Sequence, residues 1–173
     1  MFLSEVLLPP GVTDYEVHQH LYCQFDRDER GYLYRREGDS IKMLSVERPK
    51  RSSRELDVMA LPVMVPVPFT SDLIITRTRF ERGKPGARYD VRDHDQRRAW
   101  LRKQLQDVAD VPFVRFRDRM IIIKGGTRRL VASCTGTLVI RDRYAFARIL
   151  QAGLGRGKAF GCGLIWIPEV MND

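Results

Sequence analysis

Hydrophobic and polar positions alternate along the first part of the chain in the manner of strands and one helix. Residues 1–8 predict a strand that the Pro9-Pro10-Gly11 turn closes. Apolar and aromatic side chains then recur at spacings of three and four between residues 13 and 25, which predicts an amphipathic helix capped by Thr13 or Asp14. Two short strands joined by a polar turn follow, at 31–36 and 41–47. The proline-punctuated residues 56–69 predict an irregular segment, or an edge strand at best.

The second part of the chain repeats this order of elements. Residues 73–80 alternate apolar and basic positions, which predicts a half-exposed strand with Arg77 and Arg79 on its open face. The later expected elements are helices at 94–108 and 141–152 and strands at 113–116, 120–124, 133–140 and 164–167. The sequence therefore predicts an α+β fold of two tandem ferredoxin-like (RRM-like) βαββαβ domains with antiparallel sheets, divided as residues 1–70 and 71–173.

Composition excludes several classes of protein. The 173 residues are 43% hydrophobic and 30% charged, without a low-complexity tract, so we expect a folded core. The longest apolar run, residues 60–69, contains three prolines and is too short to span a membrane. No secretory signal is visible, and the three cysteines form no CxxC pair. We therefore expect a cytoplasmic protein with reduced thiols, no metal site, no cofactor and no membrane partner.

Positive charge is concentrated in one segment. Residues 77–129 hold more than half of the 30 Lys and Arg but only about a third of the 22 Asp and Glu. The planar guanidinium fork of Arg matches phosphate, so the favoured partner is a polyanion, although a solvated basic surface is an open alternative. The candidate RNA-binding side chains of the strand, the turn and the following helix are Arg77, Arg79, Arg82, Lys84, Arg88, Arg97, Arg98 and Arg102. The last three are expected on the outer face of their helix.

A glycine-rich loop, residues 153–163, separates the last helix from the terminal strand. A Rossmann fingerprint is excluded because only ten residues follow the loop, and a Walker loop is excluded because Ala159 follows Lys158. Glycine permits close backbone approach to an anion, but it also permits a tight helix-to-strand crossover, and both readings are open. The basic side chains favour phosphate. The candidate RNA-binding residues of this loop are Gly153, Gly155, Arg156, Gly157, Lys158, Gly161 and Gly163.

These motifs resemble a known family. A helix, then GxGxxKxxGxGL, then a short terminal strand is the signature of the RAMP superfamily, the repeat-associated proteins of CRISPR systems. QAGLGRGKAFGCGLIWI is similar to the loop of the CasE endoribonuclease family of type I-E (Cascade) systems, which cuts precursor CRISPR RNA within its repeat. FLSEVLL at the first strand and Tyr15-Glu-Val-His18 on the first helix match the same family. The resemblance covers most of the chain and is weakest between about residues 48 and 72.

The resemblance implies an endoribonuclease that cuts CRISPR repeat RNA without a metal ion, by attack of the RNA's own 2′-hydroxyl. It then stays on the repeat stem-loop, in precursor and mature CRISPR RNA, beside Cascade-type protein subunits. Tyr15 and His18 are the expected catalytic residues. His18 transfers protons because its pKa suits acid or base work near neutrality, and Tyr15 positions the 2′-hydroxyl or the phosphate, with exchange of roles possible. The alternative function is a RAMP subunit that clamps the RNA without cutting it.

Plainer interpretations stand beside these. Without the resemblance, Tyr15 and His18 would be an ordinary helix-face aromatic and a satisfied histidine. His20 is two residues from His18 and so projects elsewhere, which argues against a paired metal site, but His20 remains a rival for the acid role. We expect His94 to mark a helix start without catalytic work. We expect Trp100 in the core, and Cys162 as a small buried side chain.

Overall fold

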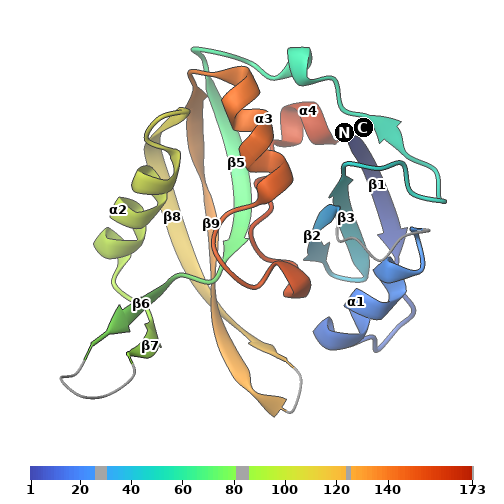
Figure 1. The fold of residues 1–173 in the computed structure, drawn as a ribbon, viewed down its shortest axis with the longest axis horizontal. Coiled ribbons are helices and arrows are strands. Elements are labelled where there is room, and N and C mark those ends of the chain that lie inside the picture. The colour runs from blue at the N-terminus through green and yellow to red at the C-terminus, as the bar shows by residue number, and fades with distance from the viewer. Residues whose placement is uncertain (26–30, 81–85, 124–125, 173) are drawn as a thin grey trace.

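The computed structural model describes residues 1–25, 31–80, 86–123 and 126–172, and the chain folds into two sheet-based halves that lie side by side (Figure 1). The first sheet has the order β2–β3–β1–β4 and is antiparallel throughout. Its strands are β1 (Phe2–Leu7), β2 (Tyr32–Glu37), β3 (Ser40–Ser45) and β4 (Arg54–Glu55). Helix α1 (Asp14–Tyr22) connects β1 to β2, and a short 3-10 helix, η1 (Val58–Ala60), follows β4.

The second sheet has the order β5–β9–β8 and is also antiparallel. Its strands are β5 (Pro66–Leu73), β8 (Ala109–Ile122) and β9 (Arg128–Ile140), with α2 (His94–Leu105) before β8 and α3 (Arg143–Ala152) after β9. A separate two-stranded hairpin, β6 (Thr76–Arg79) and β7 (Ala87–Asp90), lies between β5 and α2. The chain ends in η3 (Lys158–Phe160) and α4 (Pro168–Met171).

Both halves have a ferredoxin-like order. In the second half, Trp166 forms a bridge with Thr70 on the edge of β5 that β9 does not occupy. In the first sheet, β4 pairs with the corresponding edge of β1. The terminal segment around Trp166 therefore takes the edge position that the predicted strand 164–167 was expected to take. The described part of the first half has all four strands of the expected βαββαβ pattern but one of its two α-helices. The predicted tandem ferredoxin-like fold is confirmed.

Strand β5 lies at the edge of its sheet, so the alternative prediction of an edge strand within residues 56–69 is confirmed from Pro66 onward. The predicted strand at 73–80 corresponds to β6, but it does not open the second half, because β5 precedes it. Strand β5 starts at Pro66 and crosses residue 70, the expected division between domains. The N–H of Thr70 donates to the Trp166 carbonyl, away from β9. Pro66 and Pro68 share the alternation of Thr70, so their missing N–H groups fall on the outer edge and cost no ladder bond.

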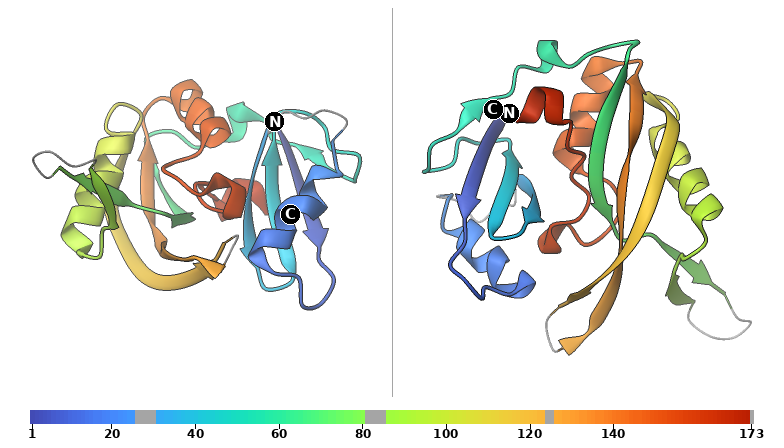
Figure 2. Two further views of the ribbon diagram at one scale, coloured as in Figure 1. Left: turned by 60° about the horizontal axis from the view of Figure 1, so that its bottom comes forward. Right: turned by 180° about the vertical axis from the view of Figure 1, so that it is seen from behind.

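Strands β8 and β9 form one long pair where the sequence predicted three short strands (Figure 2). The sequence pattern predicted a break at the polar residues 117–119. These residues continue the ladder instead, opposite residues 131–133 of β9. An antiparallel pair tolerates such polar positions, because side chains that no helix covers can be solvated while the backbone stays paired. A bulge between Asp110 and Phe113 resets the register near the start of β8.

One apolar core runs through both halves. Leu3, Leu33 and Leu44 from the first sheet belong to the same buried cluster as Phe146 and Trp166 from the second half. A smaller cluster lies between α1 and the first sheet. The two halves are therefore packed against each other by buried apolar side chains. In the described residues, no helix is long and apolar enough to cross a membrane.

Candidate nucleic-acid interface

Helix α1 is held firmly on the first sheet. Thr13 caps it, with its backbone N–H donating to the Glu16 carboxylate at 2.9 Å and its hydroxyl accepting from the Glu16 N–H. Val17 and Leu21 are fully buried against the sheet, and Asp14 forms an ion pair with Arg36 at 3.2 Å. The geometry of this helix is thus fixed at its start, on its inner face and by a charge pair.

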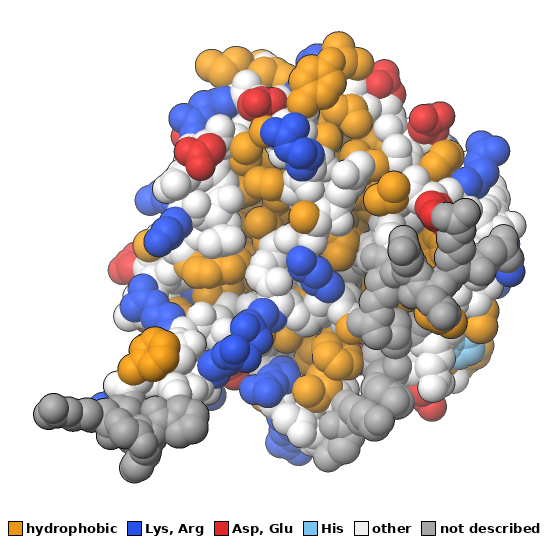
Figure 3. All heavy atoms as spheres, viewed as in Figure 1, with side chains coloured by type: hydrophobic (Ala, Val, Ile, Leu, Met, Phe, Trp, Pro, Cys, Tyr) orange, Lys and Arg blue, Asp and Glu red, His pale blue; other side chains and the backbone are white. Residues whose placement is uncertain are grey.

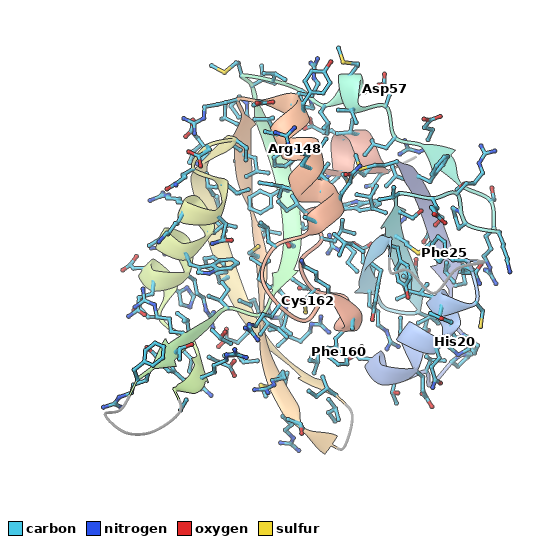
Figure 4. The ribbon with its side chains drawn as sticks, viewed as in Figure 1. His20, Phe25, Asp57, Arg148, Phe160 and Cys162 are labelled. Carbon is cyan, nitrogen blue, oxygen red and sulfur yellow. The ribbon has the colours of Figure 1, made fainter. Side chains whose placement is uncertain are left out.

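The predicted catalytic residues belong to this helix. Residues 15 and 18 lie within α1, three positions apart, as the spacing predicted. The side chains of Tyr15 and His18 lie outside the described part of the structure, so their roles stay predictions. His20 is exposed and lies on the side of α1 away from the glycine-rich loop (Figure 4).

The glycine-rich loop, residues 153–163, is packed between the two halves. Gly153, Gly155, Gly157, Gly161 and Gly163 all have positive φ, between +65° and +93°. A Cβ on Gly161 would lie 2.9 Å from the Tyr34 ring of β2, and one on Gly155 would lie 3.2 Å from the Trp100 indole of α2. The loop therefore needs glycine for backbone conformation and for close packing against both halves at once.

Several loop amides are already used within the protein. The N–H groups of Gly153, Gly161 and Gly163 donate to the carbonyls of Ile149, Lys158 and Asp72. The predicted amide cradle for phosphate does not hold at these three positions, which follow the crossover reading instead. Arg156 and Lys158 are both exposed, as the phosphate reading requires. The glycines therefore follow the crossover reading, whereas phosphate binding by the two exposed basic side chains stays a prediction.

A hydrogen bond ties the loop to the first sheet. The Tyr34 hydroxyl donates to the Ala159 carbonyl in η3 at 2.9 Å. Burial raises the pKa of Tyr34 well above its ordinary value, so the phenol stays neutral and remains a donor. Helix α1 packs beside η3, and Figure 4 shows Phe160 at the end of the loop nearest that helix. The structure therefore brings the helix of residues 15 and 18 next to the segment that carries Lys158.

A basic pocket of about 330 Å³ lies between the β6–β7 hairpin, the end of the β8–β9 pair and the loop. Arg88, Arg129 and Arg156 line it together with Tyr89 and Phe160. These three arginines make no side-chain hydrogen bond or ion pair with the described residues, although Asp90 also lines the pocket. Lys and Arg side chains group in this region of the surface (Figure 3). Such a pocket offers phosphate-binding charge and aromatic surface together.

The pocket includes residues that sequence reasoning missed. Arg129 was not singled out because it lies, next to Arg128, between two predicted strands. Tyr89 was not singled out either, because no strand was predicted at the position of β7. A useful signal was present in Ala87–Asp90, where tyrosine alternates with charged residues in the manner of an exposed strand. Phe160 gave no signal, since its place depends on the folding of the glycine-rich loop.

The β6–β7 hairpin carries exposed arginines, as predicted. Arg77, Arg79 and Arg88 are all exposed, and the register pairs Thr78 with Arg88. Arg82 and Lys84 lie outside the described residues. The hairpin projects beyond the body of the second half (Figure 1), so its cations can reach a partner without displacing any packed element.

Arg97 corrects the prediction that the basic residues of α2 all face solvent. Its side chain is 0% exposed, donates to the Val91 carbonyl at 2.7 Å and forms an ion pair with Asp118 at 2.6 Å. Arg97 therefore joins α2 to β8 and has no free surface for phosphate. Arg98 pairs with Asp95 on the surface, and Arg102 is exposed while donating to the Val111 carbonyl.

Other expectations for single residues agree with the structure. His94 begins α2 after the Asp93 cap. Trp100 is half-buried and packs against the main core. Cys162 is fully buried, and burial raises its pKa to about 12, so this thiol has no nucleophilic character near neutral pH. Among the described residues, no group of His, Cys, Asp and Glu has the arrangement of a metal site.

Comparisons with known proteins agree with this picture. A sequence model of the family described as "CRISPR associated protein" matches residues 57–168. No curated protein matches the chain. Among solved structures, the chain is similar to the CRISPR-associated protein Cas6e from Escherichia coli str. K-12, with 22% identity, a TM-score of 0.82 and coverage of 96% of this chain and 98% of that one.

Two further structures show the same likeness. The CRISPR endoribonuclease Cse3 bound to 19 nt RNA matches at 18% identity and a TM-score of 0.81, covering 96% of each chain. A chain of a CRISPR RNA-guided surveillance complex matches at 17% identity and a TM-score of 0.74, covering 96% of this chain and 98% of that one. At these identities the likeness establishes a shared fold over nearly the whole length of both chains.

Proposed function

Because this chain belongs to the CRISPR-associated protein family, we propose that it is an endoribonuclease that cuts CRISPR repeat RNA without a metal ion. The observation that carries the proposal is the fold shared, over almost the full chain, with an endoribonuclease bound to RNA. A second observation supports it: α1, the helix of residues 15 and 18, packs beside η3, which begins at Lys158.

The proposed chemistry uses the RNA's own 2′-hydroxyl as the nucleophile. The protein must align that oxygen with the phosphate, remove its proton, protonate the departing 5′-oxygen and stabilise the additional negative charge. His18 supplies the proton transfer. Tyr15 positions the 2′-hydroxyl or the phosphate, and Lys158 holds a phosphate near the break. The product strand ends in a 2′,3′-cyclic phosphate or in its hydrolysis product.

Substrate binding is proposed to use the exposed arginines. Arg77, Arg79 and Arg88 of the hairpin, with Arg82 and Lys84 from the sequence between its strands, contact the backbone of the repeat stem-loop. Arg98 and Arg102 extend this track along α2, while Arg156, Gly155 and Gly157 contribute from the loop. Phosphate contacts of this kind set affinity and register more than sequence choice.

The first test is incubation with a cognate repeat transcript in EDTA. One discrete cut is expected, and a matched RNA with a 2′-deoxy sugar just upstream of the break should bind but stay whole. Activity that chelation removes and magnesium restores would contradict the metal-free mechanism. Tight binding with no cut under either condition would favour the non-catalytic clamp instead.

The second test compares two histidines of α1. His18→Ala should reduce the cleavage rate by about 10² to 10⁴ while repeat binding persists, which is the range for loss of a general acid or base. His20→Ala is the matched control and should cleave at close to the wild-type rate, because His20 lies on the side of α1 away from the loop. The reverse result would transfer the proton-transfer role to His20.

We also propose that the protein acts in the cytoplasm within a Cascade-type complex and remains on the repeat stem-loop after cleavage. The free cysteines fit a reducing compartment, and the likeness to a chain of a surveillance complex supports assembly with other subunits. Co-purification of the processed RNA with the tagged protein and neighbouring subunits would test this assembly.

A further inference from the structure

Along residues 113–119 of β8, the second sheet has a face that neither α2 nor α3 covers. In the right-hand view of Figure 2, β5, β9 and β8 lie in front of α3. Between Phe113 and Arg119, the odd-numbered residues of β8 point to this open face, whereas Val114 and Phe116 are buried on the helix side. We call the open-face positions Phe113, Arg115, Arg117, Arg119, Thr135 and Thr137 the open arginine face.

The open arginine face is basic and largely unpaired. Arg119 pairs with Asp72 at 3.0 Å, and the same carboxylate accepts from Ser133. Arg115 and Arg117 are exposed and form no ion pair with the described residues. Because Asp72 offsets the charge of Arg119, Arg115 and Arg117 are the two side chains of this row that can offer an uncompensated positive charge to a phosphate.

An aromatic side chain lies within this row of charge. Phe113 is 49% exposed, and the Arg115 guanidinium lies 5.1 Å from the centre of its ring. The hydroxyls of Thr135 and Thr137 lie on the neighbouring strand, opposite Arg115 and Phe113. An exposed ring beside a guanidinium can stack on a base only if that base is not already stacked within a duplex. The chemistry of this face therefore fits single-stranded RNA.

The open arginine face leads toward the candidate interface. Val131 of β9 stands opposite Arg119 and is itself buried. Arg129, which lines the basic pocket, shares the face of Val131 two positions further along the strand. Arginines thus occur on this side of the sheet from the pocket to Arg115. Helices α2 and α3 lie on the other side, so this row is separate from the proposed track of Arg98 and Arg102.

We propose that the open arginine face binds the single-stranded RNA that flanks the repeat hairpin. This inference rests on the proposed function for the identity of the RNA, but the binding chemistry does not depend on cleavage. A strand that leaves the hairpin at the basic pocket would follow Arg119, Arg117 and Arg115, with a base stacked on Phe113.

The experiment compares three non-cleavable 2′-deoxy-substituted repeat RNAs: the hairpin alone, and the hairpin with a short unpaired extension on its 5′ or its 3′ side. For the wild type, one extended RNA should bind at least tenfold tighter than the hairpin alone. The double variant Arg115→Glu with Arg117→Glu should lose this gain. For the extended RNA, the slope of log binding constant against log salt concentration should decrease in magnitude by about 0.7 for each phosphate that the variant no longer binds. Phe113→Leu, which keeps an apolar side chain, should lose part of the gain.

The matched control has the same change of net charge elsewhere. Arg51→Glu with Arg148→Glu alters exposed residues outside both tracks and should keep the gain. An equal loss in this control, or no gain from either extension in the wild type, would overturn the inference. Circular dichroism would establish that each variant is folded.

A further measurement separates this inference from the proposed function. Oligouridine binding requires neither a repeat nor cleavage, and the Arg115/Arg117 variant should weaken it several-fold. If no repeat is cut but this loss is observed, the endoribonuclease proposal fails and the inference stands. If repeats are cut but oligouridine binding is unchanged in the variant, the inference fails and the proposal stands.

Discussion

The glycine-rich loop and the β6–β7 hairpin are both short, basic and glycine-containing, yet they occupy opposite environments. The loop contacts both halves of the molecule and buries Leu154, Cys162 and Gly163. Strands β6 and β7 contain no buried residue. The difference shows that basic composition alone does not identify a binding segment. In the loop most residues fix geometry and two cations reach solvent, whereas in the hairpin the side chains are free for a partner.

The largest expected effect comes from filling the loop glycine whose added Cβ would meet only backbone atoms. A Cβ on Gly163 would lie 2.6 Å from the Leu154 carbonyl oxygen, at a φ of +93°. Because backbone cannot move aside as a side chain can, Gly163→Ala should lower the free energy of unfolding by about 2 to 5 kcal/mol. Denaturant unfolding measures this change.

The turn between β2 and β3 provides the control. Gly38 also has a positive φ, +63°, but a Cβ there would meet nothing within 4 Å. Gly38→Ala should therefore lower the free energy of unfolding only by the cost of a positive φ at alanine, about 1 to 2 kcal/mol. Equal losses at Gly38 and Gly163 would mean that close packing of the loop contributes nothing to stability.

The same contrast exists between neighbouring residues of α2. Arg97→Ala should lower the free energy of unfolding by about 3 kcal/mol, because it removes a buried guanidinium that bonds Val91 and Asp118. Arg98→Ala has the same helix-propensity change but removes a surface pair worth less than about 0.5 kcal/mol. Thermal unfolding of the two variants compares them, and a similar loss in both would contradict a structural role for Arg97.

The hairpin should show the opposite behaviour, with large effects on binding and small effects on stability. In the triple variant Arg77→Ala, Arg79→Ala, Arg88→Ala, the slope of log binding constant against log salt concentration should decrease in magnitude. The decrease should be up to about 0.9 for each phosphate of the repeat that the variant no longer binds. Each substitution should change stability by no more than about 0.5 kcal/mol, because all three side chains are exposed. Binding titrations at several salt concentrations test this, and an unchanged slope would remove the hairpin from the interface.

Helices could be predicted from the sequence because their apolar spacing survives in the fold. The predicted helices at 13–25, 94–108 and 141–152 correspond to α1, α2 and α3, with shifted ends. Strand β5 was predicted only as an alternative to an irregular segment, because its prolines resemble a loop unless the outer edge of the sheet is known. Arg97 was misplaced because its burial depends on Asp118, a partner that the sequence alone does not identify.

The candidate site was predictable in its parts but not in its assembly. Motif resemblance indicated α1 and the glycine-rich loop separately. The contact that joins them to one sheet, Tyr34 to Ala159, spans 125 positions, and no local pattern encodes it. Arg115 and Arg117 were likewise visible as basic residues, but their common open face depends on the register of β8 after its bulge.

The Tyr34 contact gives the smallest and most specific prediction. Tyr34→Phe removes the hydrogen bond to Ala159, which is worth about 1 kcal/mol at pH 8. Burial raises the pKa of Tyr34 in the folded state, so its contribution is fully present below the unfolded pKa of about 10 and is lost as pH rises above it. At one pH unit above that value, ionisation of the tyrosine stabilises the unfolded wild type by about 1.4 kcal/mol. The stability advantage of the wild type over Tyr34→Phe should therefore vanish near pH 11. The buried thiols, whose pKa values are also raised, act in the same direction in both proteins and cancel from the difference. Urea unfolding at pH 8 and near pH 11 measures the difference in free energy of unfolding between the wild type and Tyr34→Phe. If this difference is the same at both pH values, Tyr34 is not buried as a neutral donor to the loop.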